Sequence, residues 1–261
     1  MKLRKEECTD MDGAVAIPVI DFHSHILPCM DDGSSSLEES LALLEASHSQ
    51  GIKAIVATPH FYPDEESPRS FLKRRRKACE MLLSAYDPEV HPTVYIGAEV
   101  AYFNGIGRSR YMKDLAIEGT DVILVEMPFS EWSESFVEEI RFLRESLGLI
   151  PVIAHIERYL KYQKKGTLKR MLANGALIQS NATNFTDIKT VKTAMKMLLH
   201  NDIHLLGSDC HNTENRPQNL QSALSVIETK KGSGCLEQMS SLAEFLLEDA
   251  IAIDQEKEVK K

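Results

Sequence analysis

Seven short apolar runs, each followed by a longer segment, constrain the fold of this chain more than any other feature. Between several of them, apolar residues recur at helical spacing, as in residues 37–48 and 135–147. Strands that alternate with helices are typical of a parallel sheet, and seven such units come close to the eight of a TIM barrel. We therefore predict an α/β fold, a distorted (β/α)7 TIM-like barrel. The runs lie at 17–20, 52–57, 92–98, 121–125, 150–154, 176–179 and 203–208.

A single domain accounts for nearly all of the chain. At 261 residues, 43% of them hydrophobic, it is long enough to form one α/β barrel, and no linker divides it. Residues 1–16 are polar and without pattern, so we predict a flexible extension there. We place the barrel domain at 17–252 and expect the charged tail at 253–261 to be disordered.

The charge balance excludes several classes of partner. A net charge of -9 repels nucleic acid and anionic membrane surfaces, and the sequence lacks the long apolar run of a membrane-inserted helix. Five cysteines at irregular spacing, without a C-x-x-C motif, favour a reducing compartment, so we expect a cytoplasmic protein. The basic run at 73–77 invites a nucleic-acid or acidic-partner interpretation, but a solvated helix face is the favoured prediction.

Six of the seven runs end in, or within a few residues of, a histidine, an aspartate or a glutamate. In barrels the chemistry lies at the carboxyl ends of the strands, so these side chains are expected to ring one mouth. His23 and His25, two residues apart at a strand end, would point the same way. The candidate metal ligands are His23, His25, Asp32, His60, Glu99, Glu126, His155, Asp209 and His211.

This candidate set is too large for one tetrahedral ion, which needs about four ligands. Two or three ions that share a bridging carboxylate would use them all. Clusters of this kind promote in-line displacement at phosphorus. Residue chemistry alone does not choose between Asp31 and its neighbour Asp32 for the first loop.

Several of these motifs resemble the polymerase and histidinol phosphatase (PHP) superfamily. More narrowly, the chain resembles the manganese-dependent protein-tyrosine phosphatases of bacterial capsule and exopolysaccharide loci, the CpsB/YwqE-like group. The matching segments lie at 21–28, 31–33, 57–60, 97–99, 154–158, 207–212 and 216–217, in the same order and at similar spacing. Cys29 and Cys210 depart from the pattern, since small residues are usual there.

The resemblance implies a PHP-type barrel with a trinuclear site. One ion would be held by His23, His25 and Asp209; Glu99 would bridge it to a second, held by Glu126 and His155; a third would take Asp32, His60 and His211. It further implies that Arg158 and Arg216 hold the substrate phosphate. The cofactor would be Mn²⁺, two or three ions, with Fe, Zn or Co as alternatives. The substrate would be a phosphotyrosine protein, a tyrosine autokinase that controls polysaccharide export.

Other functions stay open at this point. A small-molecule phosphomonoesterase of the histidinol phosphatase kind, a phosphodiesterase, or a non-catalytic metal-binding regulatory module would carry similar ligands. Cys210 and Arg216 also satisfy C-x₅-R, the spacing of cysteine-based tyrosine phosphatases, although Glu214 would be unwelcome in a loop that binds a dianion. Asn181, near the end of the sixth run, is expected either to cap a loop or to contact substrate.

Overall fold

The computed structural model describes residues 19–255 and shows a curled, wholly parallel sheet. Because β3 continues β2 after two residues, and β5 continues β4 likewise, the described strands occupy seven positions. Their bounds are β1 Val19–Ser24, β2 Ile52–Ala57, β3 His60–Phe61, β4 Thr93–Ile96, β5 Glu99–Ala101, β6 Val122–Glu126, β7 Ile150–Ile153, β8 Leu177–Asn181 and β9 Leu205–Gly207.

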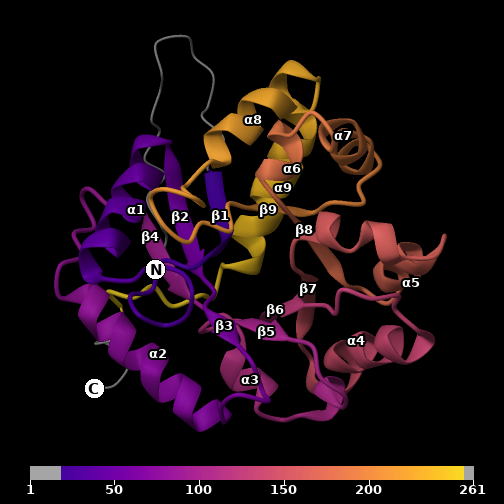
Figure 1. The fold of residues 1–261 in the computed structure, drawn as a ribbon, viewed down its shortest axis with the longest axis horizontal. Helices are drawn as coiled ribbons and strands as arrows, with labels where there is room; N and C mark the ends of the chain where they lie inside the picture. Colours follow the sequence, from indigo (N-terminus) through magenta and orange to yellow (C-terminus); the bar gives the residue numbers. More distant parts are fainter. Residues whose placement is uncertain (1–18, 256–261) are drawn as a thin grey trace.

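The strand order brings the two ends of the sheet together. One part runs β1-β2-β4, and the other runs β3-β5-β6-β7-β8-β9. A bridge between Ser24 and Cys210 joins β1 to the chain just after β9, and the Asp209 backbone N–H donates to His23 O at 2.8 Å. The sheet therefore curls back on itself, as Figure 1 shows, and the predicted α/β barrel class is confirmed.

Two short strands, β3 and β5, follow β2 and β4 after a break near the site: β2 matches the predicted run at 52–57, whereas β4 ends before the predicted run at 92–98 does. Pro59, which lacks an N–H, separates β2 from β3, and a proline inside a strand removes a ladder hydrogen bond. Gly97 and Ala98 separate β4 from β5, and a Cβ on Gly97 would lie 3.1 Å from the Ile117 side chain. These breaks let His60 and Glu99 pair with each other in register on a new pair of strands, β3 and β5.

Helices and 3-10 turns connect the strands and cover the outside of the sheet. Ser36 accepts a hydrogen bond from the Glu39 backbone N–H and caps the first helix, but the Glu39 carboxylate returns to Ser35 instead of completing a capping box. The helices are α1 Leu37–Ser49, α2 Pro68–Leu83, α3 Met112–Leu115, α4 Glu134–Leu147, α5 Thr167–Ala173, α6 Thr183–Thr186, α7 Val191–Leu199, α8 Leu220–Thr229 and α9 Ser233–Leu246; the 3-10 turns are η1 Ile106–Arg108, η2 Ile156–Arg158 and η3 Leu160–Tyr162.

The last two helices, which the sequence analysis did not identify, complete the core. In Figure 1, α9 lies behind β1 and β9, and it packs against both. Its Leu246 joins one apolar cluster with Phe22 and Val152 from the strands. Beyond it, Ile253 is 1% exposed and its N–H donates to Val94 O, so the packed chain reaches at least that residue.

The predicted extension at 1–16 and residues 256–261 of the predicted tail lie outside the described residues. Between residues 19 and 255, every helix is too short or too polar to cross a bilayer.

Candidate metal centre

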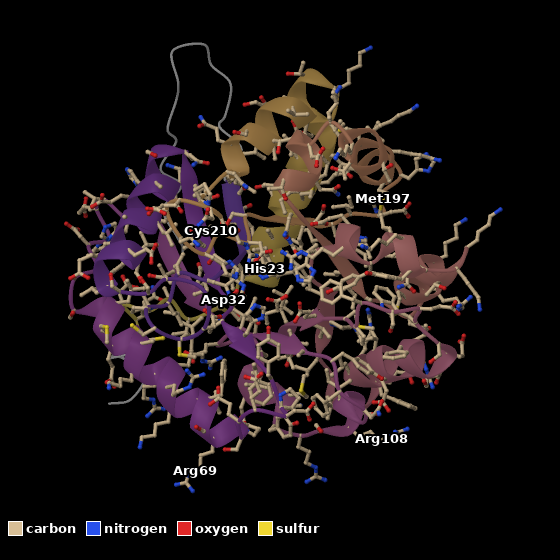
Figure 2. All side chains as sticks on the ribbon, in the orientation of Figure 1. His23, Asp32, Arg69, Arg108, Met197 and Cys210 are labelled. Carbon is tan, nitrogen blue, oxygen red and sulfur yellow. The ribbon has the colours of Figure 1, made fainter. Side chains whose placement is uncertain are left out.

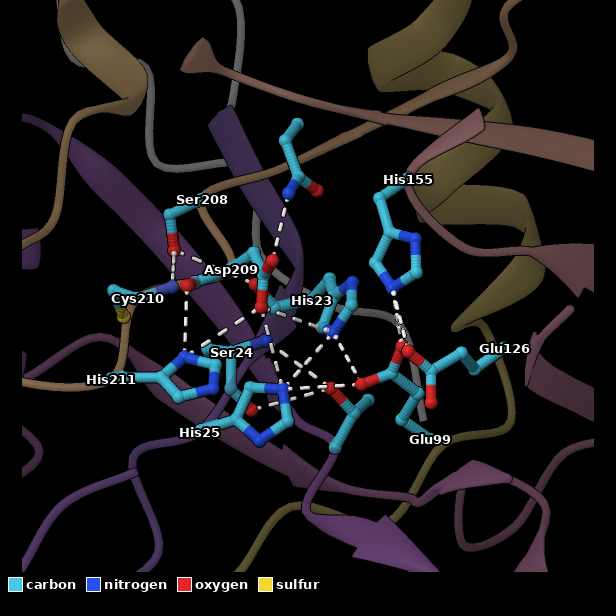
Figure 3. A network of polar contacts seen from close by, with 12 residues as sticks. His23, Ser24, His25, Glu99, Glu126, His155, Ser208, Asp209, Cys210 and His211 are labelled. Atoms are coloured by element: carbon cyan, nitrogen blue, oxygen red, sulfur yellow. Dashed lines mark hydrogen bonds and ion pairs between the residues drawn. The ribbon is translucent and has the colours of Figure 1, made fainter. Parts of the chain in front are cut away.

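Side chains from the carboxyl ends of the strands converge on one place in the middle of the curled sheet. Figure 2 places His23 and Asp32 there, and Figure 3 shows the core of the cluster from close by. The potential ligand atoms form three overlapping groups, each within 4.8 Å: His23, His25 and Asp209; His60, Glu99 and Glu126; and His25, Asp32, His60 and His211. With His155, which lies against Glu99, these are all nine residues that the sequence predicts as ligands.

The centre of the cluster is a close pair of imidazoles between two carboxylates. His23 Nε2 and His25 Nε2 are only 3.1 Å apart. Glu99 Oε2 lies 3.2 Å from the first nitrogen and 3.3 Å from the second, and Asp209 Oδ1 lies 3.6 and 3.5 Å from them. Two ring nitrogens and two carboxylate oxygens that face one point are a donor set that suits a divalent cation.

Glu99 connects this pair to the next group. Its Oε1 is 2.7 Å from His155 Nε2, which in turn is 3.7 Å from Glu126 Oε1. Burial opposes ionisation of Glu99, but His23 and His155 outweigh it and hold the pKa of this carboxyl well below its usual range. Burial and the neighbouring Glu99 charge raise the pKa of Glu126 to about 7. The site thus concentrates negative charge where a cation would be stabilised.

The outer group contains imidazole nitrogens that face carboxylates but make no hydrogen bond, and His60 Nδ1 lies 3.1 Å from Glu99 Oε2. His60 Nδ1 and His211 Nε2 are buried atoms that lack a hydrogen bond among the described residues. Asp32 Oδ1 lies 3.4 Å from His211 Nε2 and 3.6 Å from His60 Nε2, although the Asp32 side chain is 67% exposed. A buried polar atom without a hydrogen bond is energetically unfavourable. A ligand bound in the cluster would satisfy these two nitrogens.

The two adjacent aspartates of the first loop have different environments. Asp31 Oδ2 accepts from His25 Nδ1 and from the His60 N–H, both at 2.8 Å, and its Oδ1 accepts from the Gly33 N–H. Asp31 therefore orients an imidazole from behind, as carboxylates do for metal-bound histidines. Asp32 is the one that faces the cluster.

Gln179, which the sequence patterns do not single out, and Asn181 form a buried amide pair that positions two of the candidate ligands. Gln179 Oε1 accepts from the His155 N–H at 2.6 Å and lies 3.3 Å from His23 Nδ1. Its Nε2 donates to Asn181 Oδ1, and Asn181 Nδ2 donates to Asp209 Oδ2 at 2.7 Å. Asn181 thus holds a candidate ligand. One sequence feature could have indicated this role: the sixth run, at 176–179, is the only one of the seven that ends near amide residues.

Both predicted phosphate-binding arginines lie at the rim, about one third exposed. Arg158 follows β7 in a 3-10 turn, and Arg216 lies in the loop before α8. Their Nη2 atoms lie 2.5 and 2.6 Å from Asp209 Oδ2. Two planar guanidinium groups are thereby held beside the cluster, with the geometry that suits phosphate oxygens.

Two of the candidate ligands have strained backbones. His155 has φ 29° and Asp209 has φ 55°, in the left-handed region that residues other than glycine seldom adopt. Hydrogen bonds on either side hold them: the His155 N–H donates to Gln179, and the Asp209 N–H donates to His23 O. Such strain persists only where the surrounding structure imposes it, and it is frequent at functional sites.

The C-x₅-R segment does not have the form of a phosphate-binding loop. The N–H groups of Glu214, Asn215 and Arg216 all donate to the Asn212 side-chain oxygen. The Cys210 side chain is fully buried, its sulfur points away from the cluster in Figure 3, and burial raises the pKa of the thiol. A thiolate nucleophile is therefore disfavoured here.

A comparison with solved structures first identifies the class of fold. The structure is similar to that of a histidinol phosphate phosphatase from Lactococcus lactis, with a TM-score of 0.51 and 12% identity over 86% of this chain and 94% of that one. At that identity the likeness concerns the fold alone, which is the PHP-type barrel.

The family follows from a closer match. Residues 19–244 match the family model described as "Capsular polysaccharide synthesis, CpsB/CapC", and the chain belongs to this family. It is 31% identical to the tyrosine-protein phosphatase YwqE of Bacillus subtilis over 88% of this chain and 91% of the relative. It is 30% identical to the tyrosine-protein phosphatase CpsB of Streptococcus agalactiae, over 80% and 89% of the two chains.

A solved structure agrees with these relatives. The chain superimposes with a TM-score of 0.75, at 27% identity over 89% of this chain and 96% of the other, on a structure from a study of YwqE from Bacillus subtilis and CpsB from Streptococcus pneumoniae. That study describes the two proteins as metal-dependent tyrosine phosphatases.

Proposed function

We propose that this protein is a metal-dependent phosphatase that hydrolyses phosphotyrosine in proteins. The observation that carries the proposal is the three overlapping groups of nitrogen and oxygen donors, which contain buried imidazole nitrogens without a hydrogen bond. Membership of the CpsB/CapC family and the named activity of YwqE and CpsB support the reaction and the substrate class.

The residues divide among three ions in the proposal. His23, His25 and Asp209 would hold one, Glu126 and His155 a second, and Asp32, His60 and His211 a third, with Glu99 between the first two groups. All donors are nitrogen or oxygen, a set that suits Mn²⁺ and also Fe, Zn or Co. Manganese is our proposal for the native metal.

When bound, the ions supply an activated water and neutralise charge on the phosphoryl oxygens. The protein contributes position and charge. Arg158 and Arg216 exchange their contacts with Asp209 for the phosphate and hold it against the cluster, with guanidinium groups that stay charged throughout. Gln179 and Asp31 keep the imidazoles in place. The departing tyrosinate has an aqueous pKa of ~10, so it leaves without a strong acid.

The substrate protein is proposed to be a tyrosine autokinase of a polysaccharide export system, and the compartment is proposed to be the cytoplasm. The family description, capsular polysaccharide synthesis, supports the first proposal.

Exhaustive chelation followed by addition of Mn²⁺ tests the function. Hydrolysis of p-nitrophenyl phosphate and of a phosphotyrosine peptide should be lost with the metal and recovered with it. Histidinol phosphate and a bis-aryl phosphodiester, assayed alongside, should turn over far more slowly. Full activity after chelation would rule out the metal mechanism. A preference for either alternative substrate would rule out the phosphotyrosine assignment.

A further inference from the structure

The basic run at 73–77 is not one uniform solvated face. Arg75 is only 4% exposed, its Nη1 donates to Gly97 O at 2.9 Å, and its Nη2 lies 2.8 Å from Glu118 Oε1. The prediction of a solvated helix face is therefore wrong for this residue. It holds α2 against the connection between β4 and β5.

Arg74 links α2 to the metal centre. Its Nη1 donates to Met30 O at 2.8 Å, in the loop that carries Asp31 and Asp32. Its Nη2 lies 2.5 Å from Glu66. The position of the helix is thus tied to the loop that completes the outer group of candidate ligands.

Four other cations on α2, including Lys77, have no such partner, and three of them line one hollow. Arg69, Lys73 and Arg76 are exposed and, at spacings of four and three residues, share one face of the helix. Within residues 19–255 none of them makes an ion pair or side-chain hydrogen bond. They line a hollow of about 730 Å³ together with Leu72, Tyr111 and one carboxylate, Asp114. We call this hollow the α2 groove.

The α2 groove adjoins the metal centre. A smaller cavity of about 240 Å³ beside the cluster is lined by Asp32, His60 and Tyr62, and also by Glu66 and Arg74. Ser67 and Lys73, which are adjacent in the chain to Glu66 and Arg74, line the α2 groove. In Figure 2, Arg69 lies at the lower outer edge of the molecule, below the central position of Asp32. A polypeptide bound at the cluster could therefore continue along the helix.

We propose that the α2 groove binds an acidic segment of the substrate polypeptide that flanks the phosphotyrosine. The identity of that polypeptide rests on the proposed function. The groove is a local concentration of positive charge on a chain whose net charge is -9. It therefore attracts an acidic segment, whereas the rest of the negatively charged surface repels one. Leu72 and Tyr111 add apolar contact for side chains, which suits a peptide more than a sugar-phosphate backbone.

The test compares two phosphotyrosine peptides of equal length, one with glutamates beside the phosphotyrosine and one with glutamines in their place. In the triple variant Arg69→Gln, Lys73→Gln, Arg76→Gln, KM for the acidic peptide should rise roughly tenfold, because three exposed ion pairs each contribute modestly. The KM for the glutamine peptide and the hydrolysis of p-nitrophenyl phosphate should stay at the wild-type level. Added salt should abolish the preference of the wild type.

A matched triple variant controls for total charge. Lys169→Gln, Lys192→Gln and Lys196→Gln remove three exposed cations from α5 and α7, on the far side of the molecule from α2 in Figure 1. This variant should bind the acidic peptide as the wild type does. An equal rise in KM in both triple variants, or a rise for both peptides in the α2 variant, would overturn the proposal.

A binding measurement separates this proposal from the enzymatic one. Fluorescence anisotropy with a labelled acidic peptide that carries phenylalanine in place of phosphotyrosine should show binding by the wild type and weakened binding by the α2 variant, whether or not any substrate is hydrolysed. Inactivity toward every aryl phosphate would reject the phosphatase function alone. Tighter binding of a single-stranded oligonucleotide of equal charge, lost in the α2 variant, would reject the peptide assignment.

Discussion

Two buried polar regions meet at β1 and differ in whether their hydrogen bonds are complete. The Asp21 network consists of Asp21, Ser47, Ser208 and Gln218. Asp21 accepts from the Ser208 N–H at 2.8 Å, from Ser208 Oγ at 2.6 Å and from Gln218 Nε2 at 2.7 Å. Each of its carboxylate oxygens is satisfied within the chain.

The metal centre begins two residues later, at His23, and its hydrogen bonds are incomplete. His23 and His25 direct nitrogens at each other, and His60 and His211 each have a buried nitrogen without a hydrogen bond. The Asp21 network therefore stabilises the fold by itself, whereas the metal centre leaves buried nitrogens that a ligand from outside the chain would satisfy. Burial alone does not distinguish a structural carboxylate from a functional one; the balance of donors and acceptors does.

Glu99→Gln should have the largest effect on activity. Loss of the carboxylate that faces His23, His25 and His155 should lower kcat/KM for p-nitrophenyl phosphate by at least about a hundredfold, more than the loss of an outer partner. Metal analysis should show fewer bound ions, while urea unfolding of the metal-free protein should show no loss of stability. Retained metal content and activity would place the reaction elsewhere.

Asp31→Asn should have an intermediate effect and distinguishes the two loop aspartates. Because Asp31 orients His25, its loss should weaken metal affinity by about 10 to 100-fold and leave the number of ions at saturation unchanged. Asp32→Asn is the matched variant, and it should lower that number by one. Titration with Mn²⁺ measures the affinity and the number of bound ions. If Asp31→Asn lowered the number of ions and Asp32→Asn lowered only the affinity, Asp31 would be the ligand and Asp32 the orienting residue.

Asp21→Asn should affect stability rather than catalysis. The new amide would direct N–H groups at existing donors, which should lower the free energy of unfolding by about 1–3 kcal/mol. At saturating Mn²⁺ the activity should stay near that of the wild type. Urea denaturation measures the loss, with the exposed Asp64→Asn as the control. A loss of activity as severe as that of Glu99→Gln would show that the two regions are not separable.

Cys210→Ser should have the smallest effect. The thiol is buried and points away from the cluster, so turnover of p-nitrophenyl phosphate should persist, with at most a modest loss of stability. The same assay on His211→Gln, the neighbouring candidate ligand, should show a clear loss. Inactivity of the serine variant with its fold intact would restore the thiolate mechanism.

The barrel class and the meeting of the nine candidate ligands follow from the sequence, because parallel strands place their carboxyl ends at one edge. His23 and Asp209 are recognisable since each lies at or shortly after the end of an apolar run. Their ligand roles and those of the two arginines remain predictions for the experiments above.

The supporting residues were harder to predict. Gln179 joins His23 to His155 only because β8 lies between β7 and β9 in a particular register, which local pattern does not encode. The breaks after Ala57 and Ile96 depend on packing that a run of apolar residues conceals. Asp31 and Asp32 have the same local propensity, and the contacts of Asp31 with His25, His60 and Gly33, which the sequence does not show, distinguish them.

The positive φ angles of His155 and Asp209 have an evolutionary consequence. Each costs of order 1–3 kcal/mol, and a glycine at either position would relieve the strain while it removed a candidate ligand. A lineage selected for thermal robustness alone would lose these side chains early, and a lineage that retains activity must recover the cost elsewhere. Heat-stable but inactive descendants of this chain should carry glycine at these two positions before they change the barrel around them.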